Sequence, residues 1–384
     1  MAVSHLSPEE EELIAAIREI ATERVAPRAA EIDRTGEFPW DMKELLAQQD
    51  IYAMPFPVEY GGLGSTKLAV VRAIEELSRC CATTGLLLAV QQLGAMPILL
   101  AGSEEQKRKY LPPLARGEWL AAFGLTEAGS GSDAAAMRTV AVRKGDRYIL
   151  NGSKRFITNG GLAQVNTVFA LTDPQAGTRG ISAFIVERDF PGFAVGRVED
   201  KMGIKGSQTA ELIFNDCEVP AENLIGREGE GFRIAMRTLD RTRPGIGAQA
   251  VGIAQGALDL AVSYSKQRVQ FGRPIAENQG IQFMLADMAT KVEAARLLVY
   301  NVAEMIDRGE ERFTMYSSMA KMFASDIAMQ VTSDAIQILG GYGYMKEYPA
   351  ERMLRDAKIT QIYEGTNQIQ RLVIARELLA RASA

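Results

Sequence analysis

Residues 180–189 read GISAFIVERD, an apolar run of strand length in a chain whose other apolar residues mostly follow helical spacing. Glycine, Asn, Asp and Pro separate this run from its neighbours, which is the pattern of strands joined by turns. Because no helical segments alternate with these runs, we predict an antiparallel β-domain over residues 121–230. The neighbouring runs are RYILNG at 147–152, NTVFALT at 166–172 and TAELIFNDCEV at 209–219.

Helical patterns occupy both sides of this segment. In the first part, Ser7 precedes Pro8 and a cluster of acids, which are signals of a helix start. Helical periodicity returns from residue 229, where a four-helix bundle is expected. The sequence therefore predicts an α+β protein with a helical domain at 1–120, a β-domain at 121–230 and a helical bundle at 231–384. Helices are expected at 41–50, 66–82, 84–101, from Ser103, and near 229–267, 278–308, 313–339 and 367–382.

The composition is that of an ordinary globular protein, with 47% hydrophobic and 24% charged residues. A net charge of −5 argues against a general affinity for nucleic acid or anionic membranes. We see no apolar run of membrane length and no signal-peptide pattern at the start. Cys80, Cys81 and Cys217 show no metal-ligand spacing, and their odd number argues against a disulfide framework. A soluble cytoplasmic protein is expected.

The single histidine is His5, close to the start of the chain. Its place excludes Ser-His-Asp and Cys-His chemistry, so acid–base work falls on Asp, Glu, Lys, Tyr or Cys. Glu364, within IYEGTNQIQR at 362–371, is a candidate. From the residues alone, the favoured interpretation of Glu364 is a surface acid at a helix N-terminus, with Thr366 capping the helix.

Other segments each have a structural and a functional interpretation. FGLTEAGSGSDAAAM at 123–137 is a connecting loop, or a place where Gly129 and Gly131 let the backbone approach a ligand. FITNGG at 156–161 reads as a strand ending in an Asn-Gly turn. LDRTRPG at 239–245 reads as a salt-bridged surface patch in a helix that Pro244 kinks.

Two further segments end predicted helices. RVQFG at 268–272 places an arginine before a glycine C-cap, where the arginine compensates the helix dipole or grips a phosphate. QILGGYGY at 337–344 is a helix stop, unless a ligand lies on it.

Taken in this order, the five segments FGLTEAGSGSD, FITNG, RVQFG, QILGGYGY and IYEGTNQIQR resemble those of the acyl-CoA dehydrogenase family of flavoproteins. The resemblance covers essentially the whole chain, including its α–β–α division. It implies that FAD binds between the β-domain and the C-terminal helices. It implies that the Cα–Cβ bond of an acyl-CoA thioester is oxidised to the trans-2-enoyl-CoA. Glu364 would abstract the α-proton and flavin N5 would accept the β-hydride.

The resemblance also implies a homotetramer built as a dimer of dimers, which passes electrons to electron-transfer flavoprotein. Ser132 would lie near both the flavin and the substrate. Part of each FAD site would come from a neighbouring subunit. The implied cofactor-binding residues are Phe123, Leu125, Thr126, Gly131, Ser132, Phe156, Thr158, Thr366 and Gln368, with Arg268, Phe271, Gln279, Gln337, Gly340 and Gly341 reaching the FAD of the neighbour. The implied substrate-binding residues are Ser132, Asp240, Arg243, Tyr363 and Gly365.

The position of the catalytic base indicates which branch of the family the chain resembles. In the isovaleryl and long-chain branches the base lies on the helix that carries DRTRP, where this chain has Thr242, which lacks an acidic group. The resemblance therefore favours a short- to medium-chain substrate. Two departures leave the chain length open. The segment at 84–100, which usually forms the floor of the acyl pocket, looks shorter than in relatives, and Phe156 stands where a tryptophan is common.

Four other functions are compatible with parts of this pattern. A CoA-ester reductase or electron-bifurcating member would run the reaction in reverse, and an acyl-CoA oxidase would produce hydrogen peroxide. The alkylation-response branch binds DNA with the same fold, although the acidic balance and the lack of a basic C-terminal extension argue against it. A purely structural helical protein would leave the YEGT segment unexplained.

Overall fold

The computed structural model describes residues 6–381, so His5 lies outside the described residues. Six α-helices precede the sheet, and the predicted N-cap at Ser7 is confirmed because its side chain accepts the N–H of Glu10. Ser103 and Gln106 form a capping box at the start of α6. The helices are α1 (Pro8–Ile20), α2 (Ala29–Thr35), α3 (Trp40–Gln48), α4 (Lys67–Cys80), α5 (Ala82–Ala101) and α6 (Glu104–Ala115).

The middle of the chain forms an eight-stranded sheet, with the order β6-β7-β3-β2-β4-β5-β8 and with β1 paired to β4. Most pairs are antiparallel, but β1–β4 and β2–β4 are parallel, so the expectation of a wholly antiparallel sheet is wrong for these two pairs. The β2–β3 hairpin intervenes before β4, and two reversals of direction leave β4 running with β2. The strands are β1 (Ala121–Gly124), β2 (Val140–Lys144), β3 (Arg147–Thr158), β4 (Val165–Leu171), β5 (Ile181–Glu187), β6 (Phe193–Val198), β7 (Thr209–Pro220) and β8 (Leu224–Ile225).

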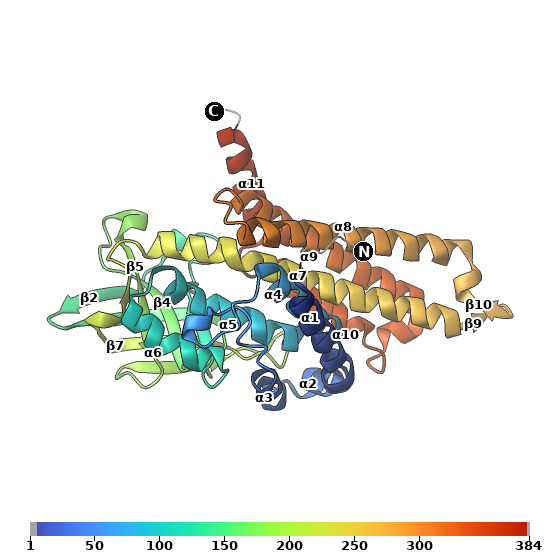
Figure 1. Ribbon diagram of the computed structural model, residues 1–384, viewed down its shortest axis with the longest axis horizontal. Coiled ribbons are helices and arrows are strands. Elements are labelled where there is room, and N and C mark those ends of the chain that lie inside the picture. The colour runs from blue at the N-terminus through green and yellow to red at the C-terminus, as the bar shows by residue number, and fades with distance from the viewer. Residues whose placement is uncertain (1–5, 382–384) are drawn as a thin grey trace.

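Long helices follow the sheet and run along the longest axis of the molecule (Figure 1). Helix α7 contacts α8, α9 and α10, whereas α11 packs on α9 and then rises away from the body (Figure 1). Helix α10 was not expected from the sequence. The bounds are α7 (Gly231–Gln267), α8 (Gln279–Asp307), α9 (Thr314–Leu339), α10 (Ala350–Thr360) and α11 (Asn367–Arg381), with the short strands β9 (Val269–Gln270) and β10 (Arg273–Pro274) between α7 and α8.

One apolar core joins the helices before and after the sheet. It contains Ile74 on α4, Val251 on α7, Val299 on α8 and Val331 on α9. The two helical segments of the chain therefore pack as one body, although the sheet separates them in sequence.

Two helices are long and apolar enough to cross a membrane, contrary to the expectation from the sequence. They are α5 and α7, and 72% and 78% of their most apolar windows are buried inside the protein. Their burial against other helices and the sheet identifies them as core helices. A second apolar cluster, which includes Leu125 after β1 and Leu239 on α7, joins α7 to the sheet.

Candidate active site

The loop between α10 and α11 carries Glu364 in an unusual backbone conformation. Glu364 has φ +53° and Gly365 has φ +93°, so two successive residues are left-handed. A Cβ atom on Gly365 would lie 2.6 Å from Nε2 of Gln370, so a larger residue would have to displace this side chain as well as adopt the strained φ. A left-handed non-glycine residue costs roughly 1–2 kcal/mol. Contacts from the surrounding helices must therefore hold Glu364 in place.

Helix α7 supplies the first of these contacts. The hydroxyl of Thr242 donates a 2.7 Å hydrogen bond to Oε2 of Glu364. The next residue, Arg243, donates from Nε to the Glu364 carbonyl at 3.2 Å. The side chain at position 242 thus faces the carboxylate of Glu364.

Arg243 and Asp240 form an ion pair of 2.8 Å between Nη1 and Oδ1. The interpretation of this segment as a surface patch is wrong, because Arg243 is only 4% exposed. Asp240 is fixed in turn by α9, where Thr314 donates to its Oδ2 at 2.8 Å and Ser317 to its carbonyl at 2.7 Å. The predicted contacts of Asp240 and Arg243 with CoA stay predictions, while Arg243 has a clear structural role beneath Glu364.

Burial and the surrounding polar and charged groups have opposite effects on the pKa of Glu364. Burial raises the pKa of the Glu364 carboxyl, whereas the Thr242 hydrogen bond and the charges of Arg243, Lys67 and Lys321 act to lower it. Burial also lowers the pKa of Lys67 to about 8 and that of Lys321 to about 7. The site therefore combines a partly desolvated carboxylate with three nearby basic side chains.

Tyr363 is held beside the carboxylate by two helices. Its hydroxyl donates to Oε1 of the buried Gln249 on α7. Gln249 donates in turn from Nε2 to the carbonyl of Ala82, at the start of α5, at 3.0 Å. Burial raises the pKa of Tyr363 well above its usual value, so the phenol stays protonated.

The loop after β1 is fixed to β3 by a buried ion pair. Lys154 is fully buried, and its Nζ donates to Oε1 of Glu127 at 2.7 Å and to the carbonyl of Leu125 at 3.2 Å. The Glu127 carboxylate also accepts the backbone N–H groups of Arg138 and Thr139. Leu125, Thr126, Gly131 and Ser132 therefore lie on a loop that is clamped at both ends.

Phe156 lies on a bulge of β3 and points away from the core. The register of β3 against β7 shifts between Lys154 and Ile157, and Phe156 has φ +59°. Its side chain is 59% exposed, because a bulge re-aims the residue that it contains. Thr158 follows on the same strand and is half-buried.

The residues of this surface fit a large planar ring system. Nothing lies within 4 Å of a Cβ built on Gly129 or Gly131, so the loop backbone is open to close approach. Leu125 is buried and Phe123 half-buried beside this loop, and the aromatic Phe156 is exposed on β3. The N–H of Arg155 donates to the carbonyl of Thr126 at 2.8 Å, which ties the strand that carries the exposed Phe156 to this loop, and such an arrangement suits an isoalloxazine ring.

A second set of predicted cofactor residues lies at the other end of the long helices. β9 and β10 lie at the end of the molecule opposite the sheet (Figure 1). A cavity of about 530 Å³ there is lined by Arg268, Gly340, Gly341 and Tyr342, among others, and the Arg268 guanidinium lies 5.3 Å from the Tyr342 ring centre. Phe271 is fully exposed, and Gln279 and Gln337 are also exposed.

The glycine of RVQFG does not cap α7. The helix ends at Gln267, and Gly272 with φ +79° follows Phe271 with φ +53° in the two-residue turn between β9 and β10. The predicted C-cap is therefore wrong, since the short strands place this glycine in a hairpin turn that needs positive φ. By contrast, Gly340 ends α9 as expected.

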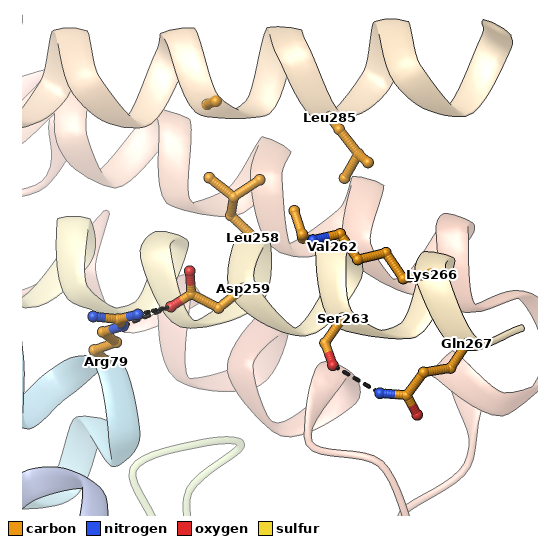
Figure 2. A pocket seen from close by; sticks show the side chains of 9 residues that line it. Arg79, Leu258, Asp259, Val262, Ser263, Lys266, Gln267 and Leu285 are labelled. Atoms are coloured by element: carbon orange, nitrogen blue, oxygen red, sulfur yellow. Dashed lines mark hydrogen bonds and ion pairs between the residues drawn. The ribbon is translucent and has the colours of Figure 1, made fainter. Parts of the chain in front are cut away.

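At the start of α11, Thr366 caps the helix, because its Oγ1 accepts the N–H of Ile369 at 3.3 Å, and Gln368 is exposed. A separate cavity of about 500 Å³ lies between α7 and α8. Figure 2 shows the side chains that line it, with the Arg79–Asp259 ion pair beside it. No predicted site residue lines this cavity.

Sequence reasoning missed the two buried lysines that face Glu364. Lys67 lies in the first turn of α4, and Lys321 lies on the buried face of α9 within the apolar run MAKMFA. A lysine on the apolar stripe of a helix was the one signal that could have identified Lys321, because lysine is almost never fully buried unless it is paired.

Comparison with known proteins gives the family. Three family models match in order: the acyl-CoA dehydrogenase N-terminal domain over residues 7–118, the middle domain over 122–217 and the C-terminal domain over 229–379. The short-chain specific acyl-CoA dehydrogenase of Clostridium acetobutylicum is 51% identical over 375 residues, which are 97% of this chain and 99% of that protein.

Two solved structures are similar over nearly the full chain. The butyryl-CoA dehydrogenase of Megasphaera elsdenii is 48% identical with a TM-score of 0.95, covering 98% of this chain and 100% of that one. A chain from work on the electron transferring flavoprotein of Acidaminococcus fermentans and flavin-based electron bifurcation is 53% identical with a TM-score of 0.96, covering 98% and 99%. This chain belongs to the acyl-CoA dehydrogenase family of oxidoreductases.

Proposed function

We propose that this protein dehydrogenates a short- to medium-chain acyl-CoA thioester to the trans-2-enoyl-CoA, with Glu364 removing the α-proton. The observation that carries the proposal is the placement of the Glu364 carboxylate, which a left-handed loop presents to α7 and which Thr242 binds at 2.7 Å. The short-chain specific and butyryl-CoA relatives support the range of chain length.

The environment of Glu364 suits a base that must act on a weak carbon acid. Burial raises the pKa of the Glu364 carboxyl and so makes the carboxylate a stronger base, while the Thr242 hydrogen bond and the nearby basic groups favour its ionised form. Within residues 6–381 the backbone N–H of Glu364 has no hydrogen-bond partner. That N–H is available to the thioester carbonyl, where a donor stabilises the enolate that develops as the proton leaves.

The substrate would lie between this loop and the sheet. Ser132, Asp240, Arg243, Tyr363 and Gly365 are the proposed substrate-binding residues. Tyr363 is fixed beside the carboxylate by Gln249, and the lack of a side chain on Gly365 lets the loop pack closely against Gln370. Arg243 is buried, so its main contribution is to hold the backbone of Glu364.

FAD is the proposed cofactor, and members of this family are FAD-dependent. When bound there, the flavin would supply an acceptor for the β-hydride. Phe123, Leu125, Thr126, Gly131, Ser132, Phe156 and Thr158 would hold the ring, with Thr366 and Gln368 completing the site. The second set at β9, β10 and the end of α9 would bind the FAD of another copy, because it lies at the opposite end of the molecule from the sheet (Figure 1).

We also propose a cytoplasmic homotetramer, a dimer of dimers, that passes electrons to electron-transfer flavoprotein. The exposed Phe271 and the cavity beside Arg268 support an assembly in which copies share cofactor sites. The A. fermentans neighbour supports a partner flavoprotein and leaves one specific rival, reduction of an enoyl-CoA. Reduction of crotonyl-CoA that depends on NADH and a partner flavoprotein would favour this rival.

A spectrum tests the proposal. The purified protein should be yellow, should contain FAD, and should bleach anaerobically with butyryl- or hexanoyl-CoA. A protein that binds no FAD, or that binds FAD and is bleached by no acyl-CoA, would exclude the proposed reaction.

A further inference from the structure

Lys321 lies under the loop that carries Glu364. Its side chain is fully buried, and its Nζ donates to the carbonyl of Gly365 at 2.8 Å and to Oδ1 of Asn367 at 2.9 Å. Both acceptors belong to the segment that directly follows Glu364, and both are neutral. These two bonds therefore fix the geometry of the loop, rather than pairing a charge with a charge.

Asn367 is itself held by the next turn of α9. Its Nδ2 donates to Oγ of Ser325 at 2.9 Å and to Oδ1 of Asp326 at 2.8 Å. Lys321, Ser325 and Asp326 thus present one rigid surface of α9 to the loop. A helix surface holds a loop more precisely than another loop would.

The carbonyl that Lys321 binds belongs to the second of the two left-handed residues. The preceding carbonyl, that of Glu364, accepts from Nε of Arg243 and from Nε2 of Gln370, both at 3.2 Å. Two successive carbonyls are therefore directed into the protein by side-chain donors. Because each peptide is planar, these bonds fix the two peptides on either side of Gly365, and the first of these peptides begins at the Cα that carries the Glu364 side chain.

We propose that Lys321 is a positioning residue for Glu364: by binding the Gly365 carbonyl and Asn367, it holds the left-handed Glu364–Gly365 pair and aims the carboxylate at the α-carbon of the substrate. This inference rests on the proposed function, because it assigns a role in presenting the base of that reaction. It adds a residue on α9 to the groups on α7 that hold Glu364.

Lys67 provides a matched comparison, since it is also buried and its charge also acts on Glu364. Its Nζ donates to Oε1 of Gln92 on α5 at 2.6 Å and makes no bond to the loop. The charged groups that act on Lys321 are Glu364 in the loop, Arg243 on α7 and Asp326 on α9. Replacing either lysine removes a cation near Glu364, but only Lys321 also holds the loop.

The experiment compares the FAD-loaded wild type with Lys321→Met and Lys67→Met. Loss of either cation raises the pKa of Glu364, so the acid limb of kcat/KM should move to higher pH in both variants. Only Lys321→Met should lower kcat at the high-pH plateau, by roughly 100-fold, as expected for a base displaced by about 1 Å. Hydrogen exchange in residues 362–371 should increase in Lys321→Met and stay unchanged in Lys67→Met.

Asn367→Ala tests the same inference without removing the charge. It should lower the plateau kcat and speed exchange in residues 362–371, with no shift of the acid limb. The inference is overturned if Lys321→Met keeps the wild-type kcat at the high-pH plateau. It is equally overturned if Lys67→Met lowers this plateau kcat as much as Lys321→Met does. It is also overturned if Lys321→Met does not fold and Asn367→Ala keeps wild-type kcat and exchange. A wild type that acyl-CoA does not bleach would instead reject the proposed function, while the exchange measurement would still test the contact.

Discussion

The hydroxyl of Thr242 on α7 donates a 2.7 Å hydrogen bond to Oε2 of Glu364 in the loop before α11. The two residues are 122 positions apart in sequence. This bond directs one carboxylate oxygen toward α7 and acts to lower the pKa of Glu364, against the effect of burial. Thr242 therefore orients the Glu364 carboxylate and acts to lower its pKa. Thr242 itself carries no acidic group.

Thr242→Val should move the acid limb of the kcat/KM profile to higher pH by roughly one unit. A hydrogen bond to a charged group contributes about 1.5 kcal/mol, and one pH unit corresponds to about 1.4 kcal/mol. Because the bond favours the ionised carboxylate, its loss lowers the rate at low pH and largely preserves the plateau. The measurement is kcat/KM for butyryl-CoA from about pH 5.5 to 9, because this profile reports the pKa of the base in the free enzyme.

Thr238→Val is the matched control for that profile. Thr238 lies one turn earlier on α7 and is fully buried, and its hydroxyl oxygen has no hydrogen-bond partner among the described residues. The same chemical change should leave the acid limb where it is. An equal shift in both variants would mean that Thr242 acts through packing and not through its bond to Glu364.

Gly365→Ala should destabilise the protein and lower its activity. The φ of +93° disfavours any L side chain, and the new Cβ would lie 2.6 Å from Nε2 of Gln370, which itself holds the loop. We expect the free energy of unfolding to fall by about 1–3 kcal/mol. Urea denaturation gives this value. Gly280→Ala is the control, since nothing lies within 4 Å of its Cβ position, and it should change stability little.

Lys154→Met should loosen the loop after β1 and weaken FAD binding. It would leave the Glu127 carboxylate buried without its cation, and breaking a buried pair by removing one partner costs about 3–5 kcal/mol. The double variant Lys154→Met with Glu127→Gln should recover much of this stability. Thermal denaturation of the apoprotein and FAD titration measure the two effects. If the double variant is no more stable than the single one, the charge of Glu127 is not the cause.

Phe271→Ser tests whether copies share their cofactor sites. Phe271 is fully exposed in the single chain, so its replacement should not affect the fold. If it contacts the FAD of another copy, FAD content per chain and the mass of the assembly should both fall. Val142→Ser, at a half-exposed position on β2, is the control. Wild-type FAD content and mass in Phe271→Ser would count against a shared site at this hairpin.

The elements that could be predicted best from the sequence are those that depend on residues close together in the chain. The caps at Ser7 and Ser103, the stop at Gly340 and the apolar strands follow from turn residues and periodicity within a few positions. The parallel pairing of β4 was missed because it depends on which strand lies beside which, and a strand's own sequence does not specify that. Gly272 was misassigned because a helix end and a hairpin turn both use glycine at positive φ.

The candidate site shows the same division. Glu364 and Gly365 could be predicted as site residues because the motif that carries them is contiguous in sequence, and their roles stay predictions. Lys321 was missed because its contact with Gly365 spans 44 positions, and nothing in α9 reveals which lysine turns inward except its apolar neighbours. Contacts between distant segments thus determine how the base is held, and they required the structure.

The most direct test of the central claim is anaerobic titration of Glu364→Gln with butyryl-CoA, followed by the flavin absorbance. This substitution keeps the shape of the side chain and removes the base, so the variant should bind FAD like the wild type and fail to bleach. General-base catalysis contributes about 10²–10⁴-fold, and the bleaching rate should fall at least that far. Bleaching of Glu364→Gln at the wild-type rate would contradict the assignment of Glu364 as the base.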